Sequence, residues 1–439
     1  MLSLAQARIG LLQLYYHDKP IYNMSFDMII TGILDLTLFN KSINYLLIRY
    51  QELKINIFLE HDNLCKRYNN NSFSTEVYLG SDLELNESNF INTPFDLSKD
   101  LLFKVLYLKQ NNKLIFIFSD LIIDGFTILI FFKEIQYIYN CLFDSNIPNF
   151  NHIKPYSKNL NVNNLLFWQN HLFISNKFNF KVKQSINNFD ENRIHFTIID
   201  NDLDYIKNNL NNATLFDYFT STFLLLLYIV TDENEITIDT LFGDYTEKNI
   251  GLFNDIILLP CKFKNTDISI NEFRKDYSKF LLNIKENRIS LEYLCNKLNL
   301  KDLPNIRIHF EYSNKNTEKE FKFGNATLKS NLYENSSNQI RQLLTLNICE
   351  FRNKIECYFS YKDKCFDFDY IMQLQNIFVD LLTNSDEIVS QIKNKYDIKN
   401  YYTVIYKEKI DKRLLSYSYA GKYPNIKFSE FKKILDKTS

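Results

Sequence analysis

Apolar positions along the 439-residue chain alternate between two patterns. Continuous apolar runs predict buried strands, and apolar residues spaced three and four apart predict helices. The first half is expected to hold strands at 22–33 and 113–119 and helices at 8–16, 36–53 and 125–143. The helix at 8–16 is predicted to be amphipathic, whereas the helix at 125–143 is apolar on most sides and is expected to be buried.

The second half continues this alternation, with no internal repeat of 20–50 residues. It predicts helices at 215–230 and 370–384, and strands at 193–198, 235–243, 305–312, 343–351 and 354–361. A chain of this length with strands and helices alternating throughout predicts an α/β fold of two lobes. We place the lobes at 1–185 and 186–395, followed by an extension at 396–439.

Composition narrows the class of protein. Hydrophobic residues make up 46% and charged residues 23% of the chain, which is typical of soluble globular proteins, and the net charge of −1 predicts no attraction to nucleic acid or membrane. The seven cysteines are scattered without a CxxC pair, which indicates reduced thiols and no metal site. No signal peptide or clean apolar span is visible, so we expect a cytoplasmic protein.

The charge of the last 39 residues differs from that of the rest. Residues 401–439 hold nine Lys or Arg and four Asp or Glu. This basic tail is expected to be a solvated surface or a small added subdomain, or alternatively a docking element for an acidic partner.

The segment "FSDLIIDGF", residues 118–126, joins the apolar strand at 113–119 to the apolar helix that follows. It holds two carboxylates, Asp120 and Asp124, in surroundings otherwise suited to a core. Burying a carboxylate is costly unless it is paired or protonated. Each of these side chains therefore needs a partner or a function.

Several short motifs, taken in order, resemble the condensation domain of nonribosomal peptide synthetases, in the chloramphenicol acetyltransferase-like superfamily. The resemblance covers residues 1 to about 395 and includes "LSLAQARI", "RYQELKINIF", "TPFDL", "FWQN" and "NIGLF". It implies two lobes in a V with a tunnel between them. In that family, phosphopantetheine arms of donor and acceptor carrier proteins enter the tunnel from opposite faces.

The family's central motif has two histidines, three variable residues and Asp-Gly. Here the register is Ser119, Asp120, three apolar residues, Asp124 and Gly125, so both histidines are replaced. The second histidine is thought to act as general base or to orient the acceptor, and Asp120 stands in its place. A carboxylate with a pKa near 4 is a poorer base at pH 7 than an imidazole with a pKa near 6.5, unless burial or a like charge raises it.

Two alternatives to a catalytic Asp120 were weighed. The heterocyclisation variant of the family would place its first aspartate at position 119, where this chain has serine, so the register argues against that variant. A carboxylate tolerated in a solvated channel after catalysis was lost is the other alternative. For Asp124 the resemblance implies a buried salt bridge to an arginine of the other lobe, and for Gly125 a steric role at the helix start. The candidate arginines are Arg274, Arg288 and Arg307.

The strand expected at 305–312 carries a second group of candidates. Strand alternation puts Arg307, His309 and Glu311 on one face. The family's matching strand lies near the tunnel, so we take Ser119, Arg307 and His309 as candidate substrate contacts. An exposed sheet face is the alternative.

Two functions follow from the resemblance. The first is a stand-alone condensation-type transferase that forms an amide or ester from a carrier-bound thioester, with Asp120 as atypical catalytic group and Asp124 as its structural support. The second is a catalytically inactive scaffold that binds carrier or tailoring proteins. In both, the protein is expected to be a monomer with no cofactor of its own, because phosphopantetheine arrives on its partners.

Overall fold

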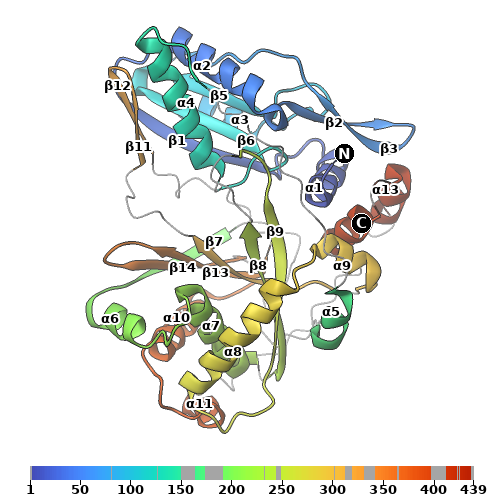
Figure 1. The fold of residues 1–439 in the computed structure, drawn as a ribbon, viewed down its shortest axis with the longest axis vertical. Coiled ribbons are helices and arrows are strands. Elements are labelled where there is room, and N and C mark those ends of the chain that lie inside the picture. Colours follow the sequence, from blue (N-terminus) through green and yellow to red (C-terminus); the bar gives the residue numbers. More distant parts are fainter. Residues whose placement is uncertain are drawn as a thin grey trace.

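The chain forms two six-stranded sheets, each with its own core (Figure 1). The predicted two-lobed α/β fold is thereby confirmed. The boundary predicted near residue 185 lies outside the described residues. The structure, a computed structural model, describes residues 2–80, 82–125, 127–149, 164–173, 191–231, 233–243, 249–300, 302–311, 319–330, 342–362, 365–396, 412–422, 424 and 426–436.

The first lobe is built around an antiparallel pair, β1 and β6, in a sheet of order β11-β12-β1-β6-β5-β4. Helices α2 and α4 lie on this sheet, and Phe39 of α2 and Phe131 of α4 pack edge-on against Phe116 and Phe118 of β6. The strand and helix expected on either side of "FSDLIIDGF" are both present. The elements are α1 (Leu4–Tyr15), β1 (Asn23–Gly32), α2 (Leu36–Arg49), η1 (Gln51–Lys54), β2 (Ile55–Glu60), β3 (Asn63–Tyr68), β4 (Glu76–Tyr78), α3 (Leu83–Asn92), β5 (Phe103–Leu108), η2 (Lys109–Asn111), β6 (Lys113–Ser119) and α4 (Thr127–Phe143).

The second lobe has a sheet of order β7-β14-β13-β10-β8-β9, in which β8, β10 and β13 are parallel. Helices α7, α8 and α10 lie on the side of this sheet away from the first lobe (Figure 1). The elements are α5 (Leu165–His171), β7 (Glu191–Ile198), α6 (Asp200–Asn208), α7 (Leu215–Thr231), β8 (Glu235–Gly243), β9 (Asn254–Lys262), α8 (Ile270–Glu286), α9 (Leu291–Lys297), β10 (Ile306–Glu311), β13 (Leu344–Glu350), β14 (Ile355–Lys362), α10 (Phe368–Leu382) and α11 (Val389–Lys395).

The lobes do not follow the chain as simply as 1–185 and 186–395. The hairpin of β11 (Lys319–Phe323) and β12 (Ala326–Ser330) leaves the second half and adds to the first sheet, where β12 pairs with β1. Its Phe323 packs 5.9 Å from Phe39. In the other direction, Trp168 of α5 is buried in the second core. Core packing therefore assigns these segments, and a boundary drawn along the sequence could not.

Helix α1 departs from the amphipathic helix predicted at 8–16. It begins at Leu4, where Ser3 and Gln6 form a capping box, and it is buried from Ala5 to Gln13. The amphipathic prediction was wrong because α1 is covered by α9 and by helices of the C-terminal tail. Its polar residues are buried against specific partners instead of facing water.

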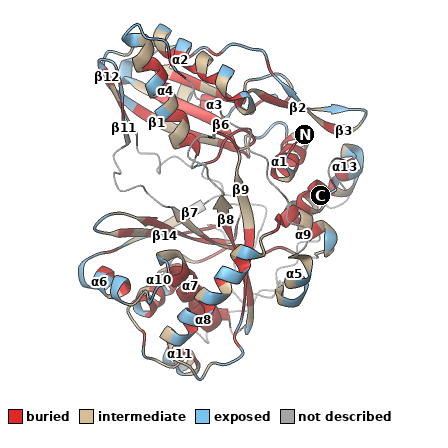
Figure 2. Cartoon of the chain, viewed as in Figure 1, coloured by how far each residue is buried: buried red, intermediate tan, exposed pale blue. Residues whose placement is uncertain are grey.

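In the described part of the basic tail, residues 412–422, 424 and 426–436, apolar side chains are buried, whereas the lysines at 422, 427, 432 and 433 are exposed. Helix α12 (Lys412–Ala420) inserts Leu414 and Tyr417 into the second core, while the residues that follow enter the first core. Figure 2 shows that α1, against which α12 packs, is largely buried. The tail residues in the first core are Tyr419, Ala420, Ile426, Phe431 and Leu435. Helix α13 (Phe428–Asp436) begins beneath the β2–β3 hairpin, where the Asp62 carboxylate accepts the Ser429 N–H at 2.8 Å. The tail thus spans both lobes as a strap.

Asp62→Gly tests this attachment. The backbone of Asp62 has φ 67°, which glycine adopts without strain, so the change removes only the capping carboxylate. We expect the tail to lose about 1 kcal/mol of local stability and to be cleaved faster in limited proteolysis. Lys432→Ala, an exposed site on the same helix, is the control. Equal cleavage rates for both variants would contradict the capping role.

Candidate functional site

The loop between β6 and α4 is fixed on three sides by hydrogen bonds to its backbone. The Ser119 N–H donates to the Leu102 carbonyl at 2.8 Å, and the Asp120 N–H donates to the Tyr22 carbonyl at 2.9 Å. From α1, Gln6 Nε2 donates to the Leu121 carbonyl at 3.2 Å. The loop that carries Asp120 and Asp124 is therefore tied by its own backbone to α1 and to the residues before β1 and β5.

Asp124 connects this loop to the second half of the chain. Its side chain is buried, and its oxygens accept backbone N–H groups from Thr127 at 3.0 Å, Phe253 at 2.8 Å and Asn254 at 3.1 Å. The Thr127 hydroxyl donates to the Gly251 carbonyl at 2.8 Å. We call this set of contacts between the loop and residues 250–254 the latch.

The predicted arginine partner of Asp124 is wrong. Each candidate arginine has other partners. Arg274 donates to the backbone carbonyls of Leu381 and Asn384, and Arg288 donates to the backbone carbonyl of Lys285. Arg307 forms an ion pair with Asp239. Ile250 is buried in the first core. The residues that follow it therefore lie beside Asp124, and the backbone N–H groups of Phe253 and Asn254 take the place of a cation.

Neutral donors change the electrostatics of the latch. Burial raises the pKa of the Asp124 carboxyl, the N–H bonds from Phe253, Thr127 and Asn254 lower it, and the net direction is upward. An arginine would have lowered this pKa instead.

The other loop candidates have different surroundings. Ser119 is buried, and its Oγ accepts the Leu121 N–H at 3.3 Å, so the hydroxyl faces its own loop. A Cβ on Gly125 would meet no atom within 4 Å, which overturns the predicted steric role of this glycine. Asp120 is half-buried. It is the ionisable side chain of the loop that remains partly open to solvent.

Arg307 and His309 share one face of β10, as strand alternation predicts. Arg307 Nε lies 2.5 Å from Asp239 Oδ1, and Gln342 Nε2 donates to Asp239 at 2.8 Å. The guanidinium is thus committed to neutralising a buried carboxylate, which favours a structural role. His309 Nδ1 lies 3.3 Å from Asn347 Oδ1.

The sequence did not predict the ion pair that Arg8 and Glu292 form at the junction of the lobes. Arg8 of α1 lies 2.9 Å from Glu292 of α9, both side chains are largely buried, and the guanidinium lies 4.5 Å from the Tyr417 ring of the tail. Burial acts to lower the pKa of Arg8, but Tyr417, Glu292 and Tyr22 outweigh it and raise that pKa above its usual value. The signal for this pair was the place of Arg8 in the first motif, which named no partner.

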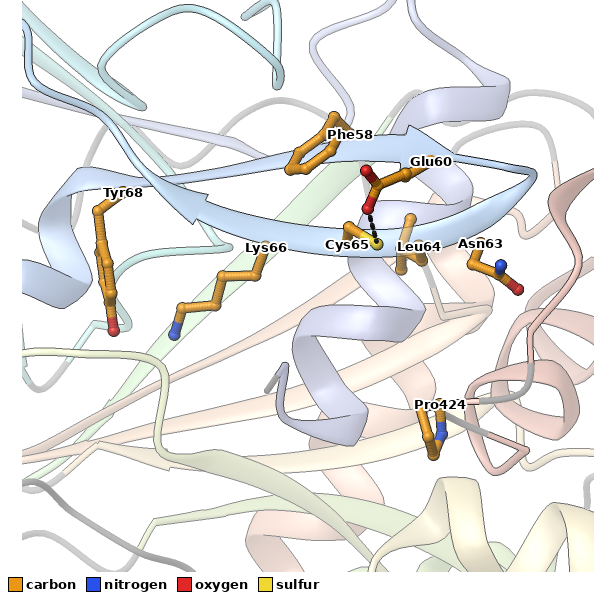
Figure 3. Close-up of a pocket in the computed structure, with 8 residues that line it drawn as sticks. All are labelled: Phe58, Glu60, Asn63, Leu64, Cys65, Lys66, Tyr68 and Pro424. Atoms are coloured by element: carbon orange, nitrogen blue, oxygen red, sulfur yellow. Dashed lines mark hydrogen bonds between the residues drawn. The ribbon is translucent and has the colours of Figure 1, made fainter.

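A shallow groove lies apart from these residues, between the β2–β3 hairpin and Pro424 of the tail (Figure 3). It contains Cys65, whose Sγ lies 3.8 Å from Glu60. Burial and the Glu60 carboxylate raise the pKa of this thiol, so it is not an activated nucleophile. The groove therefore adds no catalytic group to the candidate site.

The described part of the chain was compared with the requirements of a metal site and of a membrane-spanning helix, and it meets neither. No cluster of three His, Cys, Asp or Glu side chains there could hold a metal ion. None of the helices described is long and apolar enough to cross a membrane.

Comparison with known proteins agrees with the two-lobed fold. The condensation-domain family model matches residues 1–400. This chain belongs to the condensation-domain family. A polyketide synthase-nonribosomal peptide synthetase, ffsA, of Aspergillus flavipes is 20% identical over 329 residues, which is 68% of this chain. The match spans only 8% of that relative's length, because the relative is far longer.

Solved structures of condensation-type domains share the fold. The starter condensation domain of rhizomide synthetase RzmA, in complex with C8-CoA, superposes with a TM-score of 0.72 at 14% identity, covering 89% of this chain and 96% of that one. The X-domain from teicoplanin biosynthesis, in complex with OxyB, gives 0.75 at 13% identity, covering 92% and 96%. The family match ends at residue 400, so the two strap helices lie beyond it.

Asp124→Ala tests the latch. The change leaves the Phe253 and Asn254 N–H groups without their acceptor inside the protein, and we expect a loss of about 3 kcal/mol in the free energy of unfolding. Asp120→Ala, in the same loop but half-buried, should cost under about 1 kcal/mol. Urea unfolding measures both. Equal losses would show that the latch does not hold the loop.

Arg8→Met tests the ion pair at the lobe junction. Removing one partner leaves Glu292 buried and unpaired, so we expect a loss of about 3–5 kcal/mol, and the double variant with Glu292→Leu should recover much of it. Lys279→Met, which breaks an exposed pair with Asp276, should cost under about 1 kcal/mol. Additive losses in the double variant would argue against a coupled pair.

Proposed function

We propose that this protein is a condensation-type acyltransferase that forms an amide or ester from a carrier-bound thioester. One observation carries this proposal: the central loop is fixed by α1 and by the latch, yet it leaves Asp120 partly exposed. A fixed loop with a partly exposed carboxylate can hold an acceptor group in one position, as the reaction requires. The RzmA starter condensation domain, which shares the fold, is known in complex with C8-CoA.

The reaction needs a nucleophile, a thioester and a place for one proton. The acceptor nitrogen or oxygen attacks the thioester carbonyl, the C–S bond breaks, and the nucleophile loses a proton. Asp120 contacts the acceptor nucleophile in this scheme, and Asp124 holds the loop. The phosphopantetheine arm is part of the substrate, and carrier proteins are the partners that deliver it.

A second function, a catalytically inactive scaffold for carrier or tailoring proteins, is favoured by one observation. Neither position 119 nor position 120 holds an imidazole, and Ser119 is buried. The X-domain that shares the fold is known in complex with OxyB. The two functions differ in whether any product forms.

The test supplies a panel of straight-chain acyl-coenzyme A donors and aminoacyl N-acetylcysteamine acceptors, and detects product by mass spectrometry. Under the enzyme proposal a donor–acceptor pair gives product, and Asp120→Asn lowers its rate by about 10²-fold or more. Asp144→Asn, exposed at the end of α4, is the matched control and should be unchanged. Unchanged turnover in Asp120→Asn would remove Asp120 from the mechanism.

The scaffold function predicts a different result. No pair yields product, yet the protein binds loaded carrier proteins in a titration. Activity that appears only in Asp120→His would then indicate a decayed site with its substrate path intact.

A further inference from the structure

A row of polar side chains crosses the second sheet on the face away from its helices. The strand register puts His309 of β10 beside Asn347 of β13, and Asn347 beside Tyr358 of β14. Their chain neighbours Ile308, Ile348 and Phe359 are buried in the second core. Since successive side chains alternate between faces, the row lies on the opposite face, which is directed toward the first lobe (Figure 1).

The hydrogen bonds of Asn347 orient the His309 ring. Asn347 is buried and its Nδ2 donates to Ser360 Oγ at 3.0 Å, so its Oδ1 is the atom that faces His309 Nδ1 at 3.3 Å. An amide oxygen only accepts, so this network assigns the proton of the neutral imidazole to Nδ1. Nε2 then keeps its lone pair, and it has no hydrogen-bond partner among the described residues.

An imidazole whose Nδ1 is held by an orienting group, and whose Nε2 bonds to none of the described residues, has the arrangement of a general base. Arg307, two residues earlier on the same face, differs from His309 because its guanidinium is ion-paired with Asp239. His309 is half-buried, so its ring is packed by its neighbours and still partly accessible to solvent.

The position of His309 along its strand brings it toward the β9 end of the latch. β10 is parallel to β8, with Arg307 opposite Asp239 and Ile308 opposite Thr240. Continuing this register by one residue puts His309 level with Leu241. Leu241 in turn pairs with Ile256 of β9. Ile256 is two residues from Asn254, whose N–H belongs to the latch. The separation from β10 across β8 to β9 is two strand spacings, and Asn254 is two residues along β9 from Ile256. Together these offsets place the His309 backbone roughly 12 Å from that of Asn254.

We propose that His309 supplies, from the second lobe, the imidazole that the central motif lacks. This inference rests on the proposed transferase function and deepens it. His309 Nε2 takes the proton from a neutral amine or hydroxyl acceptor as that group attacks the thioester carbonyl. The new C–N or C–O bond forms, the C–S bond breaks, and the proton passes to the departing thiolate. Asp120 holds the acceptor from the opposite side, and Asn347 is a positioning residue for the ring.

Other charged groups share this face and bear on any pH dependence. Asp239 and Arg307 neutralise each other, and the Arg193 guanidinium lies 5.4 Å from the Tyr358 ring. Strand alternation also puts His195, Glu356 and Lys362 on this face, among the side chains of β7 and β14 that the structure describes. His195 stacks on Tyr358 at 5.0 Å, at the far end of the row from His309, which makes it a matched control.

The test measures the single-turnover rate against pH, using the acyl-coenzyme A and aminoacyl N-acetylcysteamine pair that gives product with the wild type. His309→Ala should lower the rate by about 10²–10⁴-fold and abolish the wild-type loss of rate on acidification, and added imidazole should restore part of it. Asn347→Ala should lower the rate and shift that acid limb. His195→Ala should change neither.

Each outcome decides a separate point. A folded His309→Ala that keeps the wild-type rate and acid limb overturns the assignment of His309 while leaving the transferase function intact. Should that variant fail to fold, His309→Gln takes its place, and a wild-type rate there overturns the assignment equally. Absence of product from the wild type with every pair overturns the transferase function and this inference together.

Discussion

The contact between the Asp124 carboxylate and the backbone N–H groups of Phe253 and Asn254 is the interaction on which the rest of the structure depends. Withdrawing a carboxylate from water costs several kcal/mol, and here three N–H bonds offset that cost. The two donors stand at the start of β9, whose other residues belong to the second sheet. The same atoms therefore shape the central loop and attach one lobe to the other.

Further contacts at the lobe junction reinforce the latch. Arg8 and Glu292 form a buried ion pair beside Tyr417, the β11–β12 hairpin crosses into the first sheet, and the strap contributes side chains to both cores. Because these ties come from four separate stretches of chain, the relative position of the lobes is set by packing and hydrogen bonds. The central loop and the polar row of the second sheet are thus held in a defined relation.

That relation gives the replaced motif a chemical interpretation. A loop without imidazole is a poor catalyst by itself, since a carboxylate is ordinarily a weaker base than an imidazole at neutral pH. An oriented histidine on the facing sheet changes this, because the acid–base group and the acceptor-holding group can come from different lobes. The scaffold function needs no such histidine, so a catalytic role of His309 would belong to the transferase function alone.

Local sequence determined the elements with strong periodicity and the family to which they belong. The strand at 113–119, the helix at 215–230 and the alternation around His309 all follow from side-chain spacing, which acts over a few residues. Tertiary structure alone decided the amide partners of Asp124, the open space around Gly125, the burial of α1 and the path of the 319–330 hairpin. Those features depend on contacts between residues hundreds of positions apart, and such contacts leave no periodic trace in the chain.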